Sequence, residues 1–159
     1  MKIGVLADTH DRLPAIKKAL AGFGHHNVET VIHAGDVVAP FAAKRLLSCP
    51  GRLYVIYGNN DGEREGLKSV LPQIQDGPLT LELGGKRILI HHFADWCTPD
   101  HIAQADIIIT GHDHEVANQR RDGKLYLNPG ECCGWLYGRC TAAVLDTELM
   151  SAEIIEVAP

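Results

Sequence analysis

The stretch that decides the fold is KIGVLADTH, residues 2–10. Its apolar run is short and uninterrupted, which predicts a strand buried on both faces. Asp8 and His10 follow at the carboxyl end of that run, and Pro14 suits the first turn of a helix. We therefore expect a strand, a polar turn and a helix, the repeating unit of a parallel sheet.

The same unit follows twice more along the chain. A run at residues 30–34 ends just before Asp36, and Pro40 opens the next predicted helix. A third run at residues 53–57 ends just before Asn59. Strands that alternate with helices predict parallel pairing through right-handed crossovers.

Beyond a predicted helix at residues 63–71, turn signals indicate antiparallel strands. Gly84-Gly85 and Asp122-Gly123 each separate two short runs and predict hairpins over residues 79–90 and 116–127. The other expected elements are a helix at 99–105 and strands at 106–110, 141–145 and 152–157. We expect one α/β domain over residues 1–159, with two mixed sheets packed face to face and helices outside.

Composition narrows the function. The 159 residues carry a net charge of −5, with 45% hydrophobic and 22% charged residues, as in ordinary globular proteins. A mildly acidic chain lacks a general positive field, which disfavours nucleic acid as a partner. The five cysteines include no CxxC pair, and no apolar run reaches transmembrane length. We expect a cytoplasmic protein with reduced thiols and no membrane partner.

Polar side chains follow the predicted strands, where ligands of α/β sheets bind. The metal-capable residues just past strand ends are Asp8, Asp36, Asn59, His91 and His112. His10 and His114 join them, because residues two apart in an extended segment point the same way. Glycines at 35, 58 and 111 predict sharp turns or close contacts beside them. Two carboxylates, one amide oxygen and four imidazoles suffice for two metal ions.

The donor chemistry indicates a reaction class. Oxygen and nitrogen donors without thiolate favour Mn, Fe, Co, Ni or Zn. Two such ions about 3.5–4 Å apart can clamp a phosphate ester for in-line displacement, and they lower the pKa of a bridging water. The sequence therefore predicts hydrolysis of a small phosphate ester by a metal-bridging hydroxide.

The remaining histidines and cysteines receive plainer interpretations. His33 lies within a strand run, so we expect a buried, hydrogen-bonded ring. Strand alternation is expected to turn His92 away from the side that His91 faces. The adjacent Cys132 and Cys133 are interpreted as small buried apolar side chains.

At this point the motifs resemble those of a known family, the calcineurin-like metallophosphoesterases. The matching motifs are Asp8-Thr9-His10, Gly35-Asp36, Gly58-Asn59-Asn60-Asp61, His91 and Gly111-His112-Asp113-His114. Asn128-Pro129-Gly130-Glu131 and the chain length are similar to its small single-domain branch, the YfcE-like phosphodiesterases. The resemblance covers nearly the whole chain in the family's order.

The resemblance implies a four-layer αββα sandwich and a division of ligands. It implies a first metal held by Asp8, His10, Asp36 and His114. It implies a second metal held by Asp36, Asn59, His91 and His112, with Asp36 bridging. It also implies phosphodiester hydrolysis with divalent ions, manganese favoured and nickel frequent, and a homo-oligomer such as a dimer or tetramer.

Two positions depart from the family pattern. Many relatives carry a histidine after the second-metal asparagine, where it assists the leaving group, whereas this chain has Asn60. We expect Asn60 and Asp36 to be the catalytic side chains. The branch commonly reads His-Gly-His after the fifth strand, and this chain reads His91-His92-Phe93. Leaving-group assistance and substrate shape near Phe93 are therefore open.

Other functions share this fold or chemistry. A phosphomonoesterase would use the same residues. The net negative charge of the chain argues against a nuclease, because it disfavours binding to a polyanion. The retromer scaffold subunit has a similar fold but has lost parts of the metal site, whereas all seven positions here can bind metal. Trp135, Leu136 and Tyr137 follow a glycine-rich turn and predict an exposed apolar patch suited to self-association.

Overall fold

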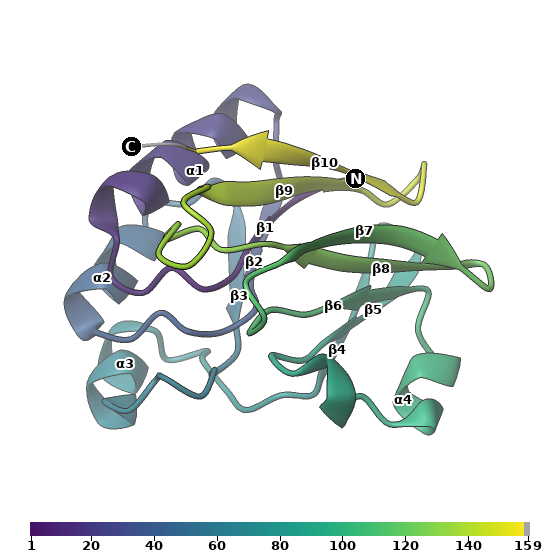
Figure 1. Cartoon of the computed structure of the whole chain (residues 1–159), viewed down its shortest axis with the longest axis horizontal. Helices are drawn as coiled ribbons and strands as arrows, with labels where there is room; N and C mark the ends of the chain where they lie inside the picture. The colour runs from purple at the N-terminus through teal and green to yellow at the C-terminus, as the bar shows by residue number, and fades with distance from the viewer. Residues whose placement is uncertain (158–159) are drawn as a thin grey trace.

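The computed structural model describes residues 1–157, two residues short of the predicted domain of residues 1–159. It contains two five-stranded sheets with helices on their outer faces (Figure 1). In spatial order, the first sheet comprises β10 (Ser151–Glu156), β9 (Thr141–Asp146), β1 (Lys2–Leu6), β2 (Thr30–His33) and β3 (Arg52–Val55). The second comprises β4 (Leu79–Leu83), β5 (Lys86–Ile90), β6 (Ile107–Ile109), β8 (Lys124–Pro129) and β7 (Val116–Arg121). The helices are α1 (Leu13–His25), α2 (Pro40–Leu46), α3 (Arg64–Val70), the short 3-10 helix η1 (Ala94–Trp96) and α4 (Pro99–Ala103).

Both sheets combine parallel and antiparallel strands. β1, β2 and β3 are parallel neighbours, and β9 and β10 extend that sheet antiparallel. In the second sheet β5, β6 and β8 are parallel, while the hairpin partners β4 and β7 form antiparallel edges. The predicted mixture of crossovers and hairpins is confirmed.

Strand alternation assigns the apolar side chains to three layers. Ile3 and Val5 of β1 pack against Ile88 and Ile90 of β5 in the core between the sheets. Leu6 belongs to the core beneath α1, α2 and α3. A smaller cluster that includes Ile108 lies between the second sheet and the α4 segment. Figure 1 shows α1–α3 on one side of the molecule and α4 on another. The αββα order implied by the resemblance is therefore confirmed.

The structure differs from the predicted elements mainly between β5 and β6. The helix expected at residues 99–105 ends at Ala103, and η1 was not predicted. The strand expected at residues 106–110 is shortened to Ile107–Ile109. None of the helices in residues 1–157 has the length and apolar character needed to cross a membrane.

Candidate metal centre

The loops after five strands of the two sheets meet at one rim. Asp8 and His10 follow β1, Asp36 follows β2, and Asn59 follows β3. From the second sheet, the loops after β5 and β6 contribute His92, His112 and His114. The backbone N–H of His112 donates to Asp8 Oδ2 at 3.1 Å, which ties the two sheets together at this point. Six of the seven predicted ligands are thus brought together.

One group of donor atoms surrounds His10. Its Nε2 lies 3.5 Å from Asp36 Oδ2 and 3.9 Å from Asp8 Oδ1, and His114 Nε2 lies 3.5 Å from the same Asp8 oxygen. Donors bound to one ion at about 2.1 Å can be at most roughly 4.2 Å apart, so these spacings fit one metal. Asp8 Oδ1 and His10 Nε2 are buried without a hydrogen-bond partner among residues 1–157. Buried polar atoms are normally paired, so this observation favours a metal there.

A second group surrounds Asn59. Its Oδ1 lies 3.0 Å from His92 Nε2 and 2.9 Å from His112 Nδ1. His92 Nε2 is also 3.4 Å from Asp36 Oδ2. The same Asp36 oxygen is therefore near both groups, which is the position that a bridging carboxylate requires.

The expectation that His92 turns away from the centre was wrong. β5 ends at Ile90, so the strand pleat no longer controls the two histidines. His92 points inward, and its Nδ1 contacts the carbonyl oxygen of Ala34 at 2.8 Å. His91 lies outside the cluster, where its Nδ1 accepts a hydrogen bond from the Phe93 N–H at 3.0 Å. The structure thus places His92 where His91 was expected.

Electrostatics reflect the crowding of charges. Burial raises the pKa of Asp8 to about 6. Burial also opposes ionisation of Asp36, but hydrogen bonds from His92 and Asn60 outweigh it and lower the pKa of this carboxyl. Burial disfavours the charged form of His92, yet the Asp36 carboxylate outweighs it and raises the pKa of the ring. Two buried carboxylates beside several imidazoles suit divalent cations, which neutralise the carboxylates.

The backbone at the centre is unusual for side chains of this kind. Positive φ angles occur at Asp8 (50°), His10 (36°), Asp36 (62°), His112 (76°) and His114 (64°). Such conformations cost free energy and concentrate at functional sites. The predicted need for glycine at position 35 is confirmed: its φ is +105°, and a Cβ there would lie 2.5 Å from His92 Nδ1.

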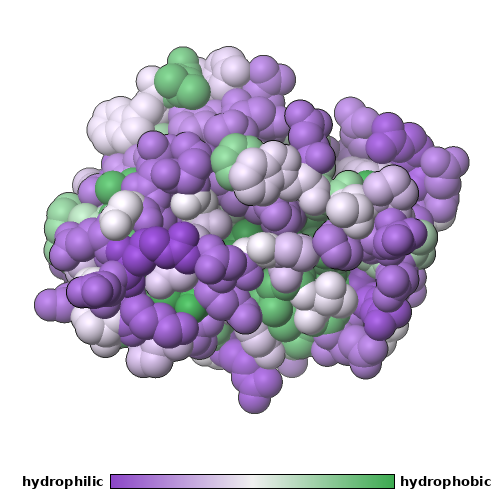
Figure 2. All heavy atoms as spheres, turned by 90° about the horizontal axis from the view of Figure 1, so that it is seen from below, coloured by the Kyte–Doolittle hydropathy of each residue, from purple (hydrophilic) through white to green (hydrophobic). Residues whose placement is uncertain are grey.

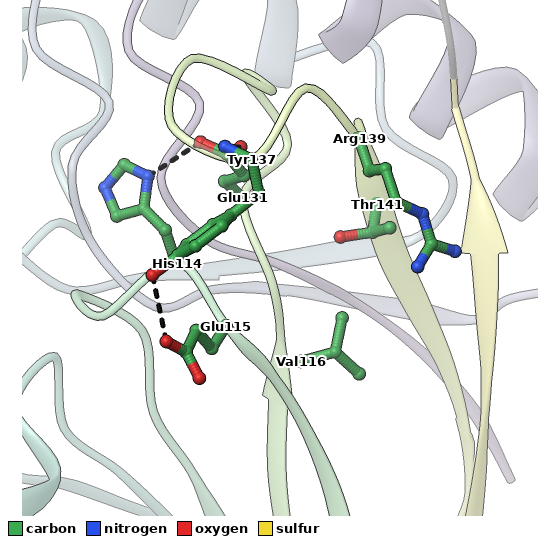
Figure 3. Close-up of a pocket in the computed structure, with 7 residues that line it drawn as sticks. All are labelled: His114, Glu115, Val116, Glu131, Tyr137, Arg139 and Thr141. Atoms are coloured by element: carbon green, nitrogen blue, oxygen red, sulfur yellow. Dashed lines mark hydrogen bonds and ion pairs between the residues drawn. The ribbon is translucent and has the colours of Figure 1, made fainter.

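Glu131 supports the centre from behind, a role that the sequence did not reveal. Its Oε2 lies 2.8 Å from His114 Nδ1, as Figure 3 shows. It also accepts backbone N–H bonds from Leu136 (2.9 Å) and Tyr137 (2.6 Å). A carboxylate bonded to the far nitrogen of a ligating histidine fixes the orientation of its ring. The Asn128–Glu131 motif provided the only sequence signal for this residue.

A pocket of about 390 Å³ has Glu131 in its lining, and Figure 3 draws the residues around it. Glu115 and Arg139 contribute to its lining. The Tyr137 hydroxyl donates to Glu115 at 2.9 Å, and Arg139 pairs with Glu156 at 2.6 Å. Its charged side chains are thus already paired, so we place the reaction at the rim.

Asn60 contacts the predicted bridging residue. Its backbone N–H donates to Asp36 Oδ1 at 2.8 Å, and its side-chain amide donates to Oδ2 at 2.7 Å. Asp61 completes this support, because its carboxylate accepts the backbone N–H groups of Asp36 at 3.0 Å and Gly58 at 2.7 Å. These bonds fix the loops after β2 and β3 relative to each other.

Other predictions concern residues outside the donor groups. His33 is fully buried, with its Nδ1 accepting from the Gly35 N–H at 3.2 Å and its Nε2 3.0 Å from the Thr9 hydroxyl. The buried, hydrogen-bonded interpretation of His33 is confirmed. All five cysteines are free, and Cys132 and Cys133 are buried as expected.

Comparison with known proteins identifies the family of this chain. The family described as the calcineurin-like phosphoesterase superfamily domain matches residues 1–150. The phosphodiesterase MJ0936 of Methanocaldococcus jannaschii is 41% identical over 156 residues, covering 93% of this chain and 94% of that protein. The chain therefore belongs to the calcineurin-like phosphoesterase superfamily, whose members are metal-dependent phosphoesterases.

Solved structures support the fold. The structure of an archaeal phosphodiesterase has a TM-score of 0.88 and 39% identity, covering 98% of this chain and 99% of that chain. Yfce, a phosphoesterase from E. coli, has a TM-score of 0.73 at 18% identity, covering 99% of this chain and 100% of that chain. The second likeness concerns the fold alone.

Proposed function

We propose that this phosphoesterase is a binuclear phosphodiesterase with a small phosphate ester as its substrate. The observation that carries the proposal is the position of Asp36 Oδ2, within 3.5 Å of His10 Nε2 and 3.4 Å of His92 Nε2. Each histidine belongs to a different donor group, so one carboxylate oxygen can join two ions. The phosphodiesterase relatives support the diester preference.

The proposed ligand sets follow the two donor groups. The first ion is assigned to Asp8, His10, Asp36 and His114. The second is assigned to Asp36, Asn59, His92 and His112. Two divalent ions, with Mn favoured over Ni, Co, Fe or Zn, would supply a bridging hydroxide for in-line attack and neutralise phosphoryl oxygens.

Asn60 is proposed to hold Asp36 in its bridging orientation through the two hydrogen bonds described above. Its amide cannot donate a proton to a departing alkoxide near neutral pH. We therefore propose that good leaving groups, such as aryl oxides, are preferred over alkoxides.

The free thiols and the lack of a membrane-crossing helix in residues 1–157 are consistent with the proposed cytoplasmic location.

The test combines Asp36→Ala with metal analysis. The Mn-reconstituted wild type is expected to bind two ions per chain and hydrolyse an aryl phosphodiester, whereas Asp36→Ala loses activity and metal from both groups. Glu148→Gln, at an exposed acid, is the matched control. Two ions retained by Asp36→Ala would refute the bridge. Full activity with Ca²⁺ alone, which prefers oxygen ligands, would refute the metal assignment.

A further inference from the structure

An aromatic pocket of about 270 Å³ adjoins the metal centre. Asn59 and His92 form the part of its lining that belongs to the centre. The rest of its lining includes Tyr57, Arg64, Asp76, His91, Phe93 and Trp96. The pocket therefore reaches two proposed ligands of the second ion and continues over side chains that the proposed ligand sets do not use.

Phe93 and Trp96 form the apolar wall. Their rings are stacked, with centroids 4.7 Å apart and planes at 24°. Phe93 also lies 4.2 Å from the ring of the proposed ligand His112, so the wall continues directly from the centre. Trp96 is 64% exposed, although an indole ring is normally largely buried. Figure 2 shows the lower face of Figure 1, the side that carries η1, as mostly hydrophilic with apolar atoms toward its middle.

Polar side chains form another part of the lining. The Arg64 guanidinium lies over the Tyr57 ring, 3.8 Å from its centroid, and it pairs with Asp76 at 2.5 Å. The Arg64 guanidinium keeps further N–H donors beside the one that Asp76 accepts, and Asp76 keeps its second carboxylate oxygen, so this pair can still bond the polar edge of a ring. An apolar wall with a few fixed polar groups is typical of a site for a small molecule.

We propose that this pocket binds an aromatic ester group of the substrate, a nucleobase or another aryl ring, stacked on the Phe93–Trp96 wall. The inference rests on the proposed function, because it requires the phosphate to sit on the metals. A volume of about 270 Å³ is large enough for one ring system. The substrate class is therefore an aryl or nucleoside phosphodiester, and Trp96 is a specificity-determining residue.

His91 lies outside the metal centre and lines this pocket. The centroid of its ring lies 5.9 Å from that of Trp96 and 6.4 Å from that of Phe93. Its hydrogen bond from the Phe93 N–H also fixes the start of the segment that leads into η1. The second histidine of the His91-His92 pair thus faces the metals, while the first supports the aromatic wall.

The experiment compares two phosphonates that differ by one ring. Phenylphosphonate and methylphosphonate are titrated calorimetrically into Mn-loaded protein. We expect the phenyl compound to bind roughly tenfold more tightly, as one stacked ring allows. Trp96→Ala is expected to reduce that ratio toward one without changing methylphosphonate affinity, and Trp96→Phe to retain most of it. Phe41→Ala, at an exposed aromatic residue of α2 away from the pocket lining, is the matched control.

The outcomes separate the two proposals. Equal binding of both phosphonates by the wild type would overturn the aromatic pocket and leave the metal centre standing. An unchanged ratio in Trp96→Ala would do the same. Failure of both phosphonates to bind Mn-loaded protein would overturn the proposed function and the pocket together. Circular dichroism checks that each variant is folded. Because Trp96 is largely exposed, its replacement is expected to leave the fold intact.

Discussion

At the scale of single residues, the pair His91-His92 shows how closely neighbouring side chains can differ in role. His92 contacts Asp36 and Asn59 inside the centre, whereas His91 packs beside Trp96. The pair lies just beyond β5, where the backbone is free of the sheet register. The orientation therefore follows from tertiary contacts, among them the bond between His92 and the Ala34 carbonyl.

This arrangement predicts unequal effects of two alanine substitutions. His92→Ala is expected to lose the second metal and to reduce kcat by at least about 100-fold, because second-site binding then depends on three donors. His91→Ala is expected to keep both metals. Metal content by mass spectrometry and hydrolysis of an aryl diester provide the measurements. Loss of metal and activity in His91→Ala but not in His92→Ala would show that His91 is the ligand.

His33 predicts a pH dependence of stability. Burial lowers its pKa from 6.5 to about 3, so the folded protein keeps the ring neutral while the unfolded chain binds a proton below pH 6.5. Its contribution is complete above that pH and is lost as pH falls toward 3, by about 1.4 kcal/mol per pH unit.

Urea unfolding of chelator-treated protein at pH 7, 6 and 5 measures this loss. His33→Gln lacks the titrating ring, so the free energy of unfolding of wild type minus variant is expected to decline with acid. Other titrating groups largely cancel in the difference. A difference that stays constant from pH 7 to 5 would contradict the assignment.

At the scale of elements, the contact between β1 and α1 depends on one glycine. A Cβ at Gly4 would lie 2.6 Å from the ring of the fully buried Phe23. The helix can therefore approach the strand only while this position has no side chain.

Gly4→Ala is accordingly expected to destabilise the fold by about 1–3 kcal/mol, the usual cost of overpacking. Gly24 of α1, next to Phe23, is a matched control, because a Cβ there meets nothing within 4 Å. Gly24→Ala is expected to stabilise by about 0.5–1 kcal/mol through helix propensity. Chemical denaturation of both variants measures the free energies. Equal effects would show that Phe23 shifts aside without cost.

The elements themselves followed closely from local patterns. The hairpin strands β4 and β5 were predicted at their observed bounds, because the double glycine between them and the apolar runs leave few alternatives. The sequence did not predict η1, and it placed the end of α4 two residues too late. Short helices have few hydrogen bonds of their own, so tertiary packing of Cys97 and Ala105 determines where they begin and end.

At the scale of the whole molecule, an apolar patch remains at the surface. Trp135, Leu136 and Tyr137 are 59%, 68% and 55% exposed, as the sequence predicted. Glu131 fixes this loop through the backbone N–H groups of Leu136 and Tyr137, so the patch is ordered before any partner arrives. An ordered apolar patch favours association, because little entropy is lost on binding.

We expect the protein to form a dimer or tetramer through this patch. Sedimentation of the wild type at increasing concentration is expected to show the oligomer, and Leu136→Glu to shift it toward monomer. Leu149→Glu, at an equally exposed leucine in the turn between β9 and β10, is the control. A wild type that stays monomeric at high concentration would remove the proposal.

The sequence by itself predicted the fold class and six of the seven side chains that the structure brings together at the candidate metal centre. These follow from local rules: apolar runs define strands, strand–helix alternation makes them parallel, and the carboxyl ends of parallel strands meet at one edge. Asp8, Asp36 and Asn59 could be placed at the rim without knowledge of any long-range contact.

Only the tertiary structure showed that His92, and not His91, points into the centre. Only the tertiary structure showed the contact between Glu131 and His114 and the pocket lined by Phe93 and Trp96. These features lie in loops, where side-chain direction has no fixed period. Their geometry depends on hydrogen bonds between segments far apart in the chain, such as His92 to Ala34 and Asn59. Such contacts exist only once the two sheets have packed together.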